Sequence, residues 1–370
     1  MAKTRRRSAR PAPKARRRTA AATAPAAGPL TLEQARALAR AKAPIRAVRK
    51  TAARATRQTT LADIGNTRAA LADAQRKERQ RRIDEYRATL AILKQRGVKA
   101  PATARAKRTA RAHALTAAPA TVATPLQILA EGDSWFDYPK PFFGGGIVPR
   151  LESLIGVPIL NLAKAGDEAR YMLGVDERRT LTTQLVNGCP AGGPWDVLLF
   201  SGGGNDIVDD PMCLWLRDFT PATPPAALID QPRFTTALAL VRAAYEDLIA
   251  VRDRVSPTTH LLFHCYDFAI PDGRGVCTLG PWMKPAFDLR GYPSLAARTP
   301  VVKEMLQQFA TMLAQVVAGH PNVSLVNGQG LLAPQPSSWD NELHPKGAGF
   351  DKHAQLFRST LQAVFPGRVF

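Results

Sequence analysis

The sequence predicts an α/β protein whose main part is a three-layer α/β/α domain with a mostly parallel, five-stranded sheet. After residue 124, short apolar runs alternate with longer amphipathic stretches. Such alternation is typical of parallel strands that helices cover on both faces of the sheet. Before that point the chain is rich in Arg, Ala and Pro, a composition that favours disorder over a packed core. We therefore expect a basic extension over residues 1–124 and a globular domain over residues 125–370.

The positive charge of the chain is concentrated in the extension. Residues 1–120 hold 31 of the 51 Lys and Arg residues but only six of the 30 Asp and Glu residues. The pI of about 10.5 therefore reflects this part alone. We expect residues 1–30 to be disordered, because their charges repel one another and they have little apolar surface to bury. A helix is expected from about 66 to 96, before Gly97, and a linker from 98 to 124.

A mobile polycation binds polyanions by releasing their counterions. Residues 1–120 are therefore expected to contact nucleic acid, polyphosphate or an anionic membrane surface, with little sequence preference. A solvated extension that only aids solubility and an organelle transit peptide are alternatives that the residues leave open. No feature of the sequence predicts the oligomeric state.

The composition disfavours membrane-spanning and disulfide-rich proteins. No run approaches the roughly 18–20 uncharged apolar residues that cross a bilayer, and the basic start lacks the Leu-rich core of a secretory signal. The four cysteines form no Cys-x-x-Cys pair and are too sparse for a disulfide scaffold. They are Cys189, Cys213, Cys265 and Cys277. We therefore expect a protein of a reducing compartment, the cytoplasm.

The elements of the domain follow in order from the apolar pattern. Five short apolar runs are the expected strands, at residues 126–130, 158–162, 197–200, 260–266 and 323–326. Four longer stretches are the expected helices, at residues 148–155, 234–255, 301–318 and 347–365. In such a sheet the functional side chains gather at the carboxyl ends of the strands.

Polar and Gly-rich blocks follow the first three strands, and a fourth polar block lies near the C-terminus. They are 131–134 (Glu-Gly-Asp-Ser), 164–167 (Lys-Ala-Gly-Asp), 201–206 (Ser-Gly-Gly-Gly-Asn-Asp) and 339–345 (Trp-Asp-Asn-Glu-Leu-His-Pro). Each block alone is a weak signal, whereas four in this order at one rim of the sheet are a strong one. Together they resemble the SGNH, or GDSL-type, hydrolase family over roughly residues 126–365. The resemblance implies the flavodoxin-like SGNH hydrolase fold and the hydrolysis of carboxylic esters.

The residue types suit ester hydrolysis, which needs a nucleophile, a base and donors for the developing oxyanion. The resemblance implies that Ser134 is the nucleophile and that His344 is the general base and then the general acid. It also implies an oxyanion hole made of the backbone N–H groups of Ser134 and Gly166 and the side-chain amide of Asn205. Glycine at position 166 suits a close backbone approach to the substrate. This chemistry needs no metal ion and no organic cofactor.

One block departs from the family's pattern. The family has Asp three residues before the His, where this chain has Asn341, and Asp340 lies four residues before it. Asn341 can hold an imidazole in one tautomer but cannot stabilise an imidazolium by charge. We expect Asp340 to reach His344, because a turn can absorb a shift of one residue; a dyad helped by Asn341 is the alternative. Glu342 ranks last if the segment is extended.

The substrate is less well defined by the sequence. Five aromatic residues follow the nucleophile and could form a wall for an acyl chain or a sugar ring, although such residues are as often part of the core. They are Trp135, Phe136, Tyr138, Phe142 and Phe143. The loop at 271–282 is expected to form another wall. The resemblance implies esterase, lipase, thioesterase or carbohydrate acetyl-esterase activity on a small-molecule, lipid or carbohydrate ester, without choosing among them.

Three other kinds of function fit the residues less well. No Gly-Lys-Ser/Thr follows the Gly-rich loop, which disfavours a phosphate-binding loop, and no Gly-x-Ser-x-Gly occurs, which disfavours an α/β-hydrolase elbow. The alternative from another class is a polyanion-binding protein whose hydrolase-like domain is an inactive scaffold. The complete set of Ser134, Gly166, Asn205 and His344 argues against it.

Overall fold

Five parallel strands form the centre of the protein, in the order β2-β1-β3-β4-β5. The computed structural model describes residues 32, 34–36, 39, 61–96, 125–138, 145–276 and 279–369. The strands are β1 (Ile128–Gly132), β2 (Ile159–Asn161), β3 (Val197–Ser201), β4 (His260–Cys265) and β5 (Val323–Asn327). Every strand lies within two residues of its predicted bounds. The predicted three-layer α/β/α fold is confirmed, and the sheet is parallel throughout.

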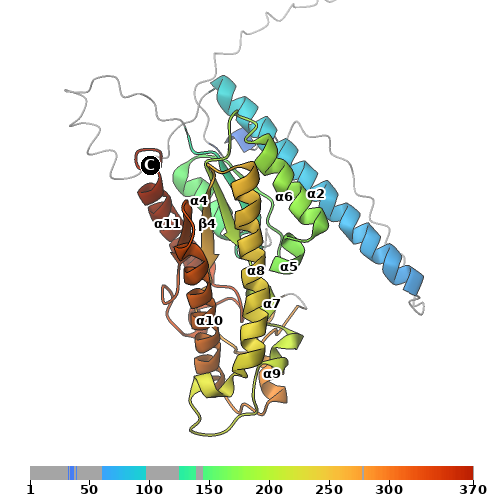
Figure 1. Cartoon of the computed structure of the whole chain (residues 1–370), viewed down its shortest axis with the longest axis vertical. Coiled ribbons are helices and arrows are strands. Elements are labelled where there is room, and N and C mark those ends of the chain that lie inside the picture. The colour runs from blue at the N-terminus through green and yellow to red at the C-terminus, as the bar shows by residue number, and fades with distance from the viewer. Residues whose placement is uncertain are drawn as a thin grey trace, which may run out of the picture.

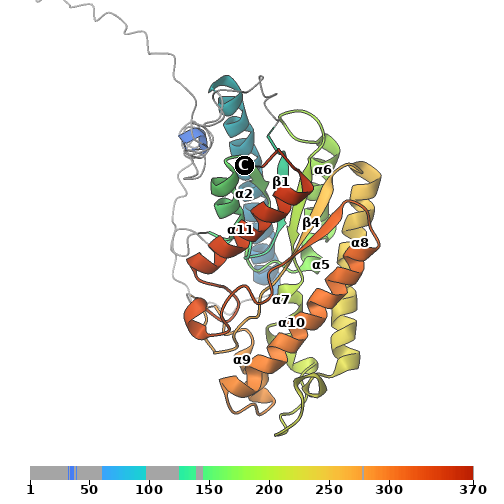
Figure 2. The ribbon, with the colours of Figure 1, turned by 90° about the vertical axis from the view of Figure 1, so that its left-hand side faces the viewer.

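Helices cover both faces of this sheet (Figures 1 and 2). The four predicted helices are α4 (Ile147–Ile155), α8 (Gln231–Val255), α10 (Leu295–Ala318) and α11 (Gly347–Val364). The helices α4 and α11 contact each other, whereas α8 contacts α10 and also α6 (Val175–Asn187). The pair α4 and α11 and the group α6, α8 and α10 lie on opposite faces of the sheet. The chain first moves from β1 to β2 and then returns past β1 to β3, and right-handed crossovers in opposite directions place their helices on opposite faces.

Several short elements have no counterpart in the prediction. They are α5 (Ala169–Met172), α7 (Gly204–Ile207), α9 (Lys284–Leu289) and the 3₁₀ turns η1 (Asp210–Leu214), η2 (Pro225–Leu228) and η3 (Pro336–Ser338). The longer helix α6 was not predicted either. Elements of one turn carry no helical periodicity that a sequence pattern could show.

The core lies on both sides of the strands. All residues of β1 and β3 are buried, as near-continuous apolar runs in a doubly covered sheet require. In the part of the chain that the structure describes, no helix is both long enough and apolar enough to cross a membrane.

A long helix precedes the domain and packs against it. Helix α2 (Leu61–Arg96) begins five residues before its predicted start and contacts β2, the edge strand (Figure 1). Ile83 and Tyr86 are buried in the same apolar cluster as the strands, and the Tyr86 ring lies 5.8 Å from that of Trp195. The C-terminal half of α2 therefore shares the core of the domain, although the helix precedes the boundary predicted at residue 124.

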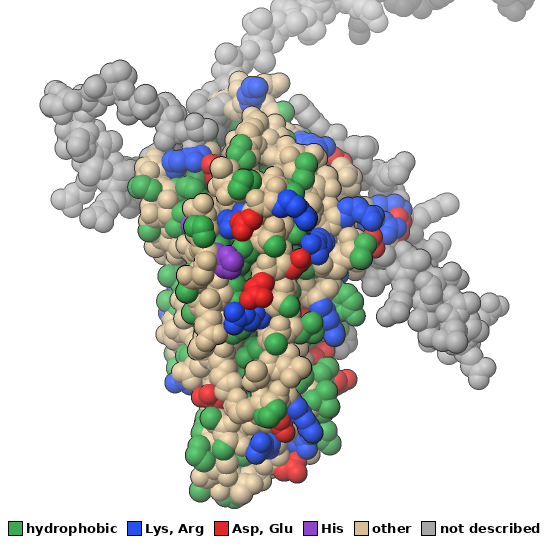
Figure 3. Space-filling model, in the orientation of Figure 1, with side chains coloured by type: hydrophobic (Ala, Val, Ile, Leu, Met, Phe, Trp, Pro, Cys, Tyr) green, Lys and Arg blue, Asp and Glu red, His purple; other side chains and the backbone are tan. Residues whose placement is uncertain are grey.

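Acidic and basic side chains are interspersed over the face of the described part shown in Figure 3. This mixture agrees with the charge count, which assigns the cationic excess to residues 1–120. The expected disorder of residues 1–30 and the expected linker at 98–124 lie outside the described residues. The expected contact with a polyanion stays a prediction.

Candidate active site

Ser134 lies two residues beyond β1, at the place where the strand order reverses and where ligands bind in open α/β sheets. A tight turn holds it there. The carbonyl of Asp133 accepts the backbone N–H groups of Phe136 and Asp137, each at 3.1 Å. The carboxylate of Asp133 accepts the N–H of Trp135 at 3.0 Å. The turn therefore fixes the backbone on both sides of the Ser134 side chain.

The imidazole of His344 lies between Ser134 and Asn341. Its Nε2 is 2.6 Å from Oγ of Ser134, and its Nδ1 is 3.0 Å from Oδ1 of Asn341. The same Oδ1 accepts the backbone N–H groups of Leu343 (2.9 Å) and His344 (3.0 Å). Because an N–H group can only donate, this atom is the amide oxygen, and Nδ1 of His344 carries the ring hydrogen. Nε2 then accepts the hydroxyl hydrogen of Ser134.

Tyr138 contacts both His344 and Asn341. Its ring stacks on the imidazole of His344, with centroids 4.3 Å apart. Its hydroxyl accepts a hydrogen bond from Nδ2 of Asn341 at 2.8 Å. All three side chains are buried. From the sequence alone Tyr138 is expected only in an aromatic wall or in the core, because its contact with Asn341 joins positions 203 residues apart.

Asp340 does not hold the imidazole, and our expectation for it was wrong. Its backbone N–H donates to the carbonyl of His344 at 2.8 Å, and no hydrogen bond between its carboxylate and the ring is present in the described residues. An isolated bridge between Trp339 and Pro345 closes the segment into a turn. In that turn Asn341 is the residue whose side chain reaches Nδ1. The family's spacing is thus kept, with Asn in place of Asp.

Glu342 instead fixes the loop between β4 and α9. Its buried carboxylate accepts four backbone N–H groups at 2.6–3.0 Å, from Gly273, Trp282, Met283 and Lys284. Burial raises the pKa of Glu342, and these four bonds oppose that rise. The loop predicted as a wall reaches the site through Trp282, whose ring lies 6.1 Å from that of His344.

The electrostatic setting keeps His344 neutral. Burial lowers its pKa to about 3, and no carboxylate among the described residues is hydrogen-bonded to it. At neutral pH the ring is therefore in the form that can take a proton. Once it has done so, the imidazolium meets the dipole of Asn341 and not a negative charge.

Of the two expected oxyanion donors outside the Ser134 turn, Asn205 is the one that lines the site. It lies in α7, and it shares a pocket with Ser134 and His344. Its Nδ2 donates to the carbonyl of Asp167 at 2.8 Å, and an amide NH₂ retains a second hydrogen for another acceptor. Gly166 has a φ of +78°, which glycine adopts without strain, but it is not part of the pocket lining.

A buried network of hydrogen bonds around Asp133 supports the Ser134 turn. The hydroxyl of Tyr266 donates to Asp133 at 2.5 Å and accepts the N–H of Gly204 at 3.2 Å. Oγ of Ser201 lies 3.1 Å from Asp133 and 3.0 Å from Nδ1 of His264. Burial raises the pKa of Asp133 to about 6, while its hydrogen bonds act to lower it. Asp133 is therefore a positioning residue that joins the ends of β1, β3 and β4.

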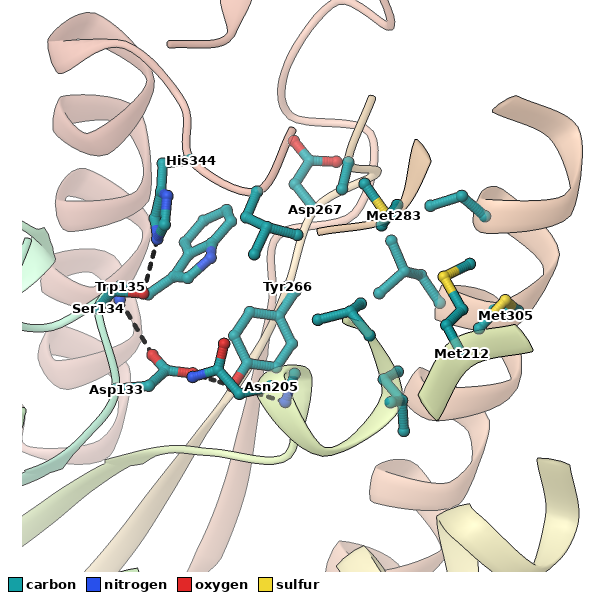
Figure 4. Close-up of a pocket in the computed structure, with 17 residues that line it drawn as sticks. Asp133, Ser134, Trp135, Asn205, Met212, Tyr266, Asp267, Met283, Met305 and His344 are labelled. Carbon is teal, nitrogen blue, oxygen red and sulfur yellow. Dashed lines mark hydrogen bonds between the residues drawn. The ribbon is translucent and has the colours of Figure 1, made fainter. Parts of the chain in front are cut away.

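The pocket beside Ser134 has an empty volume of about 550 Å³, its open mouth included. Figure 4 shows Ser134 and His344 at one end, Tyr266 in the middle, and Met212 and Met305 at the other end. Of the aromatic residues expected to form a wall, Trp135 is part of this lining, while Phe136 and Tyr138 are buried in the core. Phe142 and Phe143 lie outside the described residues. Within the described ranges, no group of three or more His, Cys, Asp or Glu residues is placed to hold a metal ion.

Comparison with known proteins finds similarity at the level of structure. No family model and no curated protein matches the chain. A lipase, Lip_vut3, from a goat rumen metagenome is 16% identical, with a TM-score of 0.42 over 63% of this chain and 96% of that chain. A family 3 carbohydrate esterase from Clostridium thermocellum is 15% identical, with a TM-score of 0.38 over 65% and 97%. An extracellular lipase from Streptomyces rimosus is 14% identical, with a TM-score of 0.37 over 63% and 99%.

These matches are too distant to add an argument about activity. The strand order and the placement of Ser134, Asn205 and His344 at one rim of the sheet are instead properties of the chain itself. On those grounds the chain has the three-layer, flavodoxin-like fold that its sequence predicts.

Proposed function

We propose that the protein hydrolyses carboxylic esters by covalent catalysis, with Ser134 as the nucleophile and His344 as the base. The observation that carries this proposal is the 2.6 Å contact between Oγ of Ser134 and Nε2 of His344. It is supported by the tautomer that Asn341 imposes, because only an unprotonated Nε2 can take the hydroxyl hydrogen.

The reaction proceeds in two halves. Oγ of Ser134 attacks the ester carbonyl as its proton passes to Nε2 of His344, and the carbonyl oxygen becomes an oxyanion. The amide of Asn205 and the backbone N–H of Ser134 donate to that oxygen, and the backbone N–H of Gly166 is the third proposed donor. His344 then gives the proton to the alcohol as the alcohol departs. The acyl group stays bonded to Oγ of Ser134. A water molecule, deprotonated by His344, releases the acid and restores the serine.

Asn341 acts as a positioning residue in this scheme. It holds the His344 ring with Nε2 towards Ser134 but supplies no charge to the imidazolium. We therefore propose an Asn-supported Ser–His pair and not a triad with an acid.

The test is hydrolysis of p-nitrophenyl acetate and butyrate by the purified full-length protein. Ser134→Ala and His344→Ala are each expected to reduce kcat by at least about 10³-fold, because removal of either member of such a pair disables both. The matched control is Ser153→Ala, which removes an exposed hydroxyl bonded to the carbonyl of Pro149. Equal rates for Ser134→Ala and Ser153→Ala would refute the proposal.

A further inference from the structure

The pocket beside Ser134 is apolar along most of its length. Beyond Tyr266 it passes between η1 and α10 and ends near Met212 and Met305 (Figure 4). Side chains from α7, the β4–α9 loop and α10 complete this part of the lining, and they are buried: Ile207, Met283 and Val302. A water molecule there would find few of the two to four polar partners that it needs. The natural occupant is therefore an apolar group.

The acidic side chains that border the pocket are already occupied. Asp133 is bonded to the hydroxyls of Tyr266 and Ser201. Asp267 accepts backbone N–H groups at 2.6–2.8 Å, from Phe268, Gly330 and Leu332. Neither carboxylate is left to recognise sugar hydroxyls, and the lining contains no Lys or Arg for a phosphate. This chemistry favours an aliphatic chain over a sugar or an anion.

The direction of the pocket decides which half of the ester it holds. The leaving alcohol must receive its proton from Nε2 of His344, so it lies on the His344 side of Ser134. Met212 and Met305 lie at the opposite end of the pocket from His344 (Figure 4). The acyl group, which stays bonded to Ser134 after the alcohol leaves, is the part that can extend towards them.

We infer that the protein acts on esters of medium-length, unbranched aliphatic acids, whose acyl chain fills this pocket. The inference rests on the proposed function and adds the acyl class to it. An acetyl group would leave the apolar end empty, and the end of the pocket near Met212 and Met305 limits the length of the chain. Three methionines, Met212, Met283 and Met305, line the pocket. Their unbranched side chains adapt to a flexible chain more readily than branched ones.

The test is the dependence of kcat/KM on acyl length, at a constant leaving group. We would use p-nitrophenyl acetate, butyrate, hexanoate, octanoate, decanoate and laurate below their critical micelle concentrations. Each methylene that enters the pocket is expected to raise kcat/KM by up to about fourfold, the equivalent of its burial free energy. The rise should end at a medium length. A second series of acetates with alcohols of increasing length should show no comparable rise.

Variants at the far end of the pocket sharpen this test. Met305→Trp fills the end and should lower the octanoate-to-acetate ratio of kcat/KM by at least about tenfold. Met305→Ala enlarges it and should move the preferred acid to a longer one. The matched controls are Leu240→Trp and Leu240→Ala, because Leu240 is exposed on α8. If Met305→Trp does not fold, the Met305→Ala profile decides.

The outcomes separate this inference from the proposed function. Hydrolysis of acetate with a flat or falling acyl profile, or the same profile in the Met305 and Leu240 variants, would overturn the inference alone. A rise with alcohol length but not with acid length would overturn the assignment of the pocket to the acyl group. Absence of hydrolysis of every ester, in folded protein, would overturn both.

Discussion

Oδ1 of Asn341 lies 3.0 Å from Nδ1 of His344, in the place where an acid would balance the charge of an imidazolium. The amide keeps the orientation of the ring, because the same oxygen also accepts two backbone N–H groups. Orientation and charge, which one carboxylate supplies together in a Ser-His-Asp triad, are thus separated in this protein.

Because Asn341 orients the ring without a charge, a negative charge introduced at position 341 should increase activity. In Asn341→Asp the new carboxylate keeps the oxygen that faces Nδ1 and stabilises the imidazolium, so kcat/KM for p-nitrophenyl butyrate should rise by about tenfold, the effect of one pKa unit. Asp340→Asn is the matched control and should change kcat/KM by less than about twofold, because its carboxylate does not bond the ring. A loss of activity in Asp340→Asn near that of His344→Ala would restore Asp340 as the partner.

The pH dependence of kcat/KM should also show that no charged partner lies beside His344. This ratio reports ionisations of the free enzyme, and burial lowers the pKa of His344 to about 3. His344 stays unprotonated, and therefore active as a base, until the pH falls towards that value. The acid limb of the profile should lie below pH 4, provided that circular dichroism shows folded protein. In Asn341→Asp the limb should move upwards, since a negative charge raises a histidine pKa. A wild-type limb near pH 6.5, the ordinary value for histidine, would contradict the account.

Asn205 should act mainly on the chemical step. Asn205→Ala removes a proposed oxyanion donor, and the loss of such a donor typically lowers kcat by about 10²–10³-fold with a smaller change in KM. Asn205→Asp is the closest control in shape, and it should be at least as damaging because its charge repels the oxyanion. Steady-state kinetics with p-nitrophenyl butyrate measures both. If the Asn205→Ala protein had the same kcat and the same thermal stability as the wild type, Asn205 would not belong to the oxyanion hole.

Arg82 of α2 should matter for the loops that follow β1 and β2. Its guanidinium donates to the carboxylate of Asp137 at 2.7 Å and to the carbonyl of Ala163 at 2.6 Å. Arg82→Met leaves both acceptors without this donor, so the free energy of unfolding should fall by about 1–3 kcal/mol. Activity should fall as well, because Asp137 belongs to the Ser134 turn. Denaturant unfolding measures the first effect.

The control for that variant is Arg87→Met, since Arg87 is exposed on the same helix. It should change the free energy of unfolding by no more than about 0.5 kcal/mol. Equal stability of the Arg82→Met and Arg87→Met proteins would mean that α2 does not support the site.

The sequence was informative wherever local pattern determines structure. Buried strands of a parallel sheet are short apolar runs, and the five strands lie where such runs occur. The pairing of Ser134 with His344 came from the resemblance of the four sequence blocks to one family, and the structure places Oγ and Nε2 of these residues 2.6 Å apart.

The sequence failed where contacts between distant segments decide the outcome. The choice of Asn341 over Asp340 depends on how Trp339 and Pro345 pair across a turn. Helix α2 packs on the edge of the sheet through Ile83 and Tyr86 and through Arg82, whose partners outside the helix lie 55 to 81 residues away. The apolar pocket is assembled from η1, α7, α10 and the β4–α9 loop, so no single stretch of sequence reveals it.

The proposed mechanism requires that His344 activates Ser134 as a nucleophile. The most direct measurement is reaction of the full-length protein with a fluorophosphonate, followed by mass mapping of the labelled residue. We predict one label, on Ser134, which is lost in Ser134→Ala, strongly slowed in His344→Ala and retained in Ser153→Ala. Folded protein that takes up no label, or takes it up at another serine, would contradict the account.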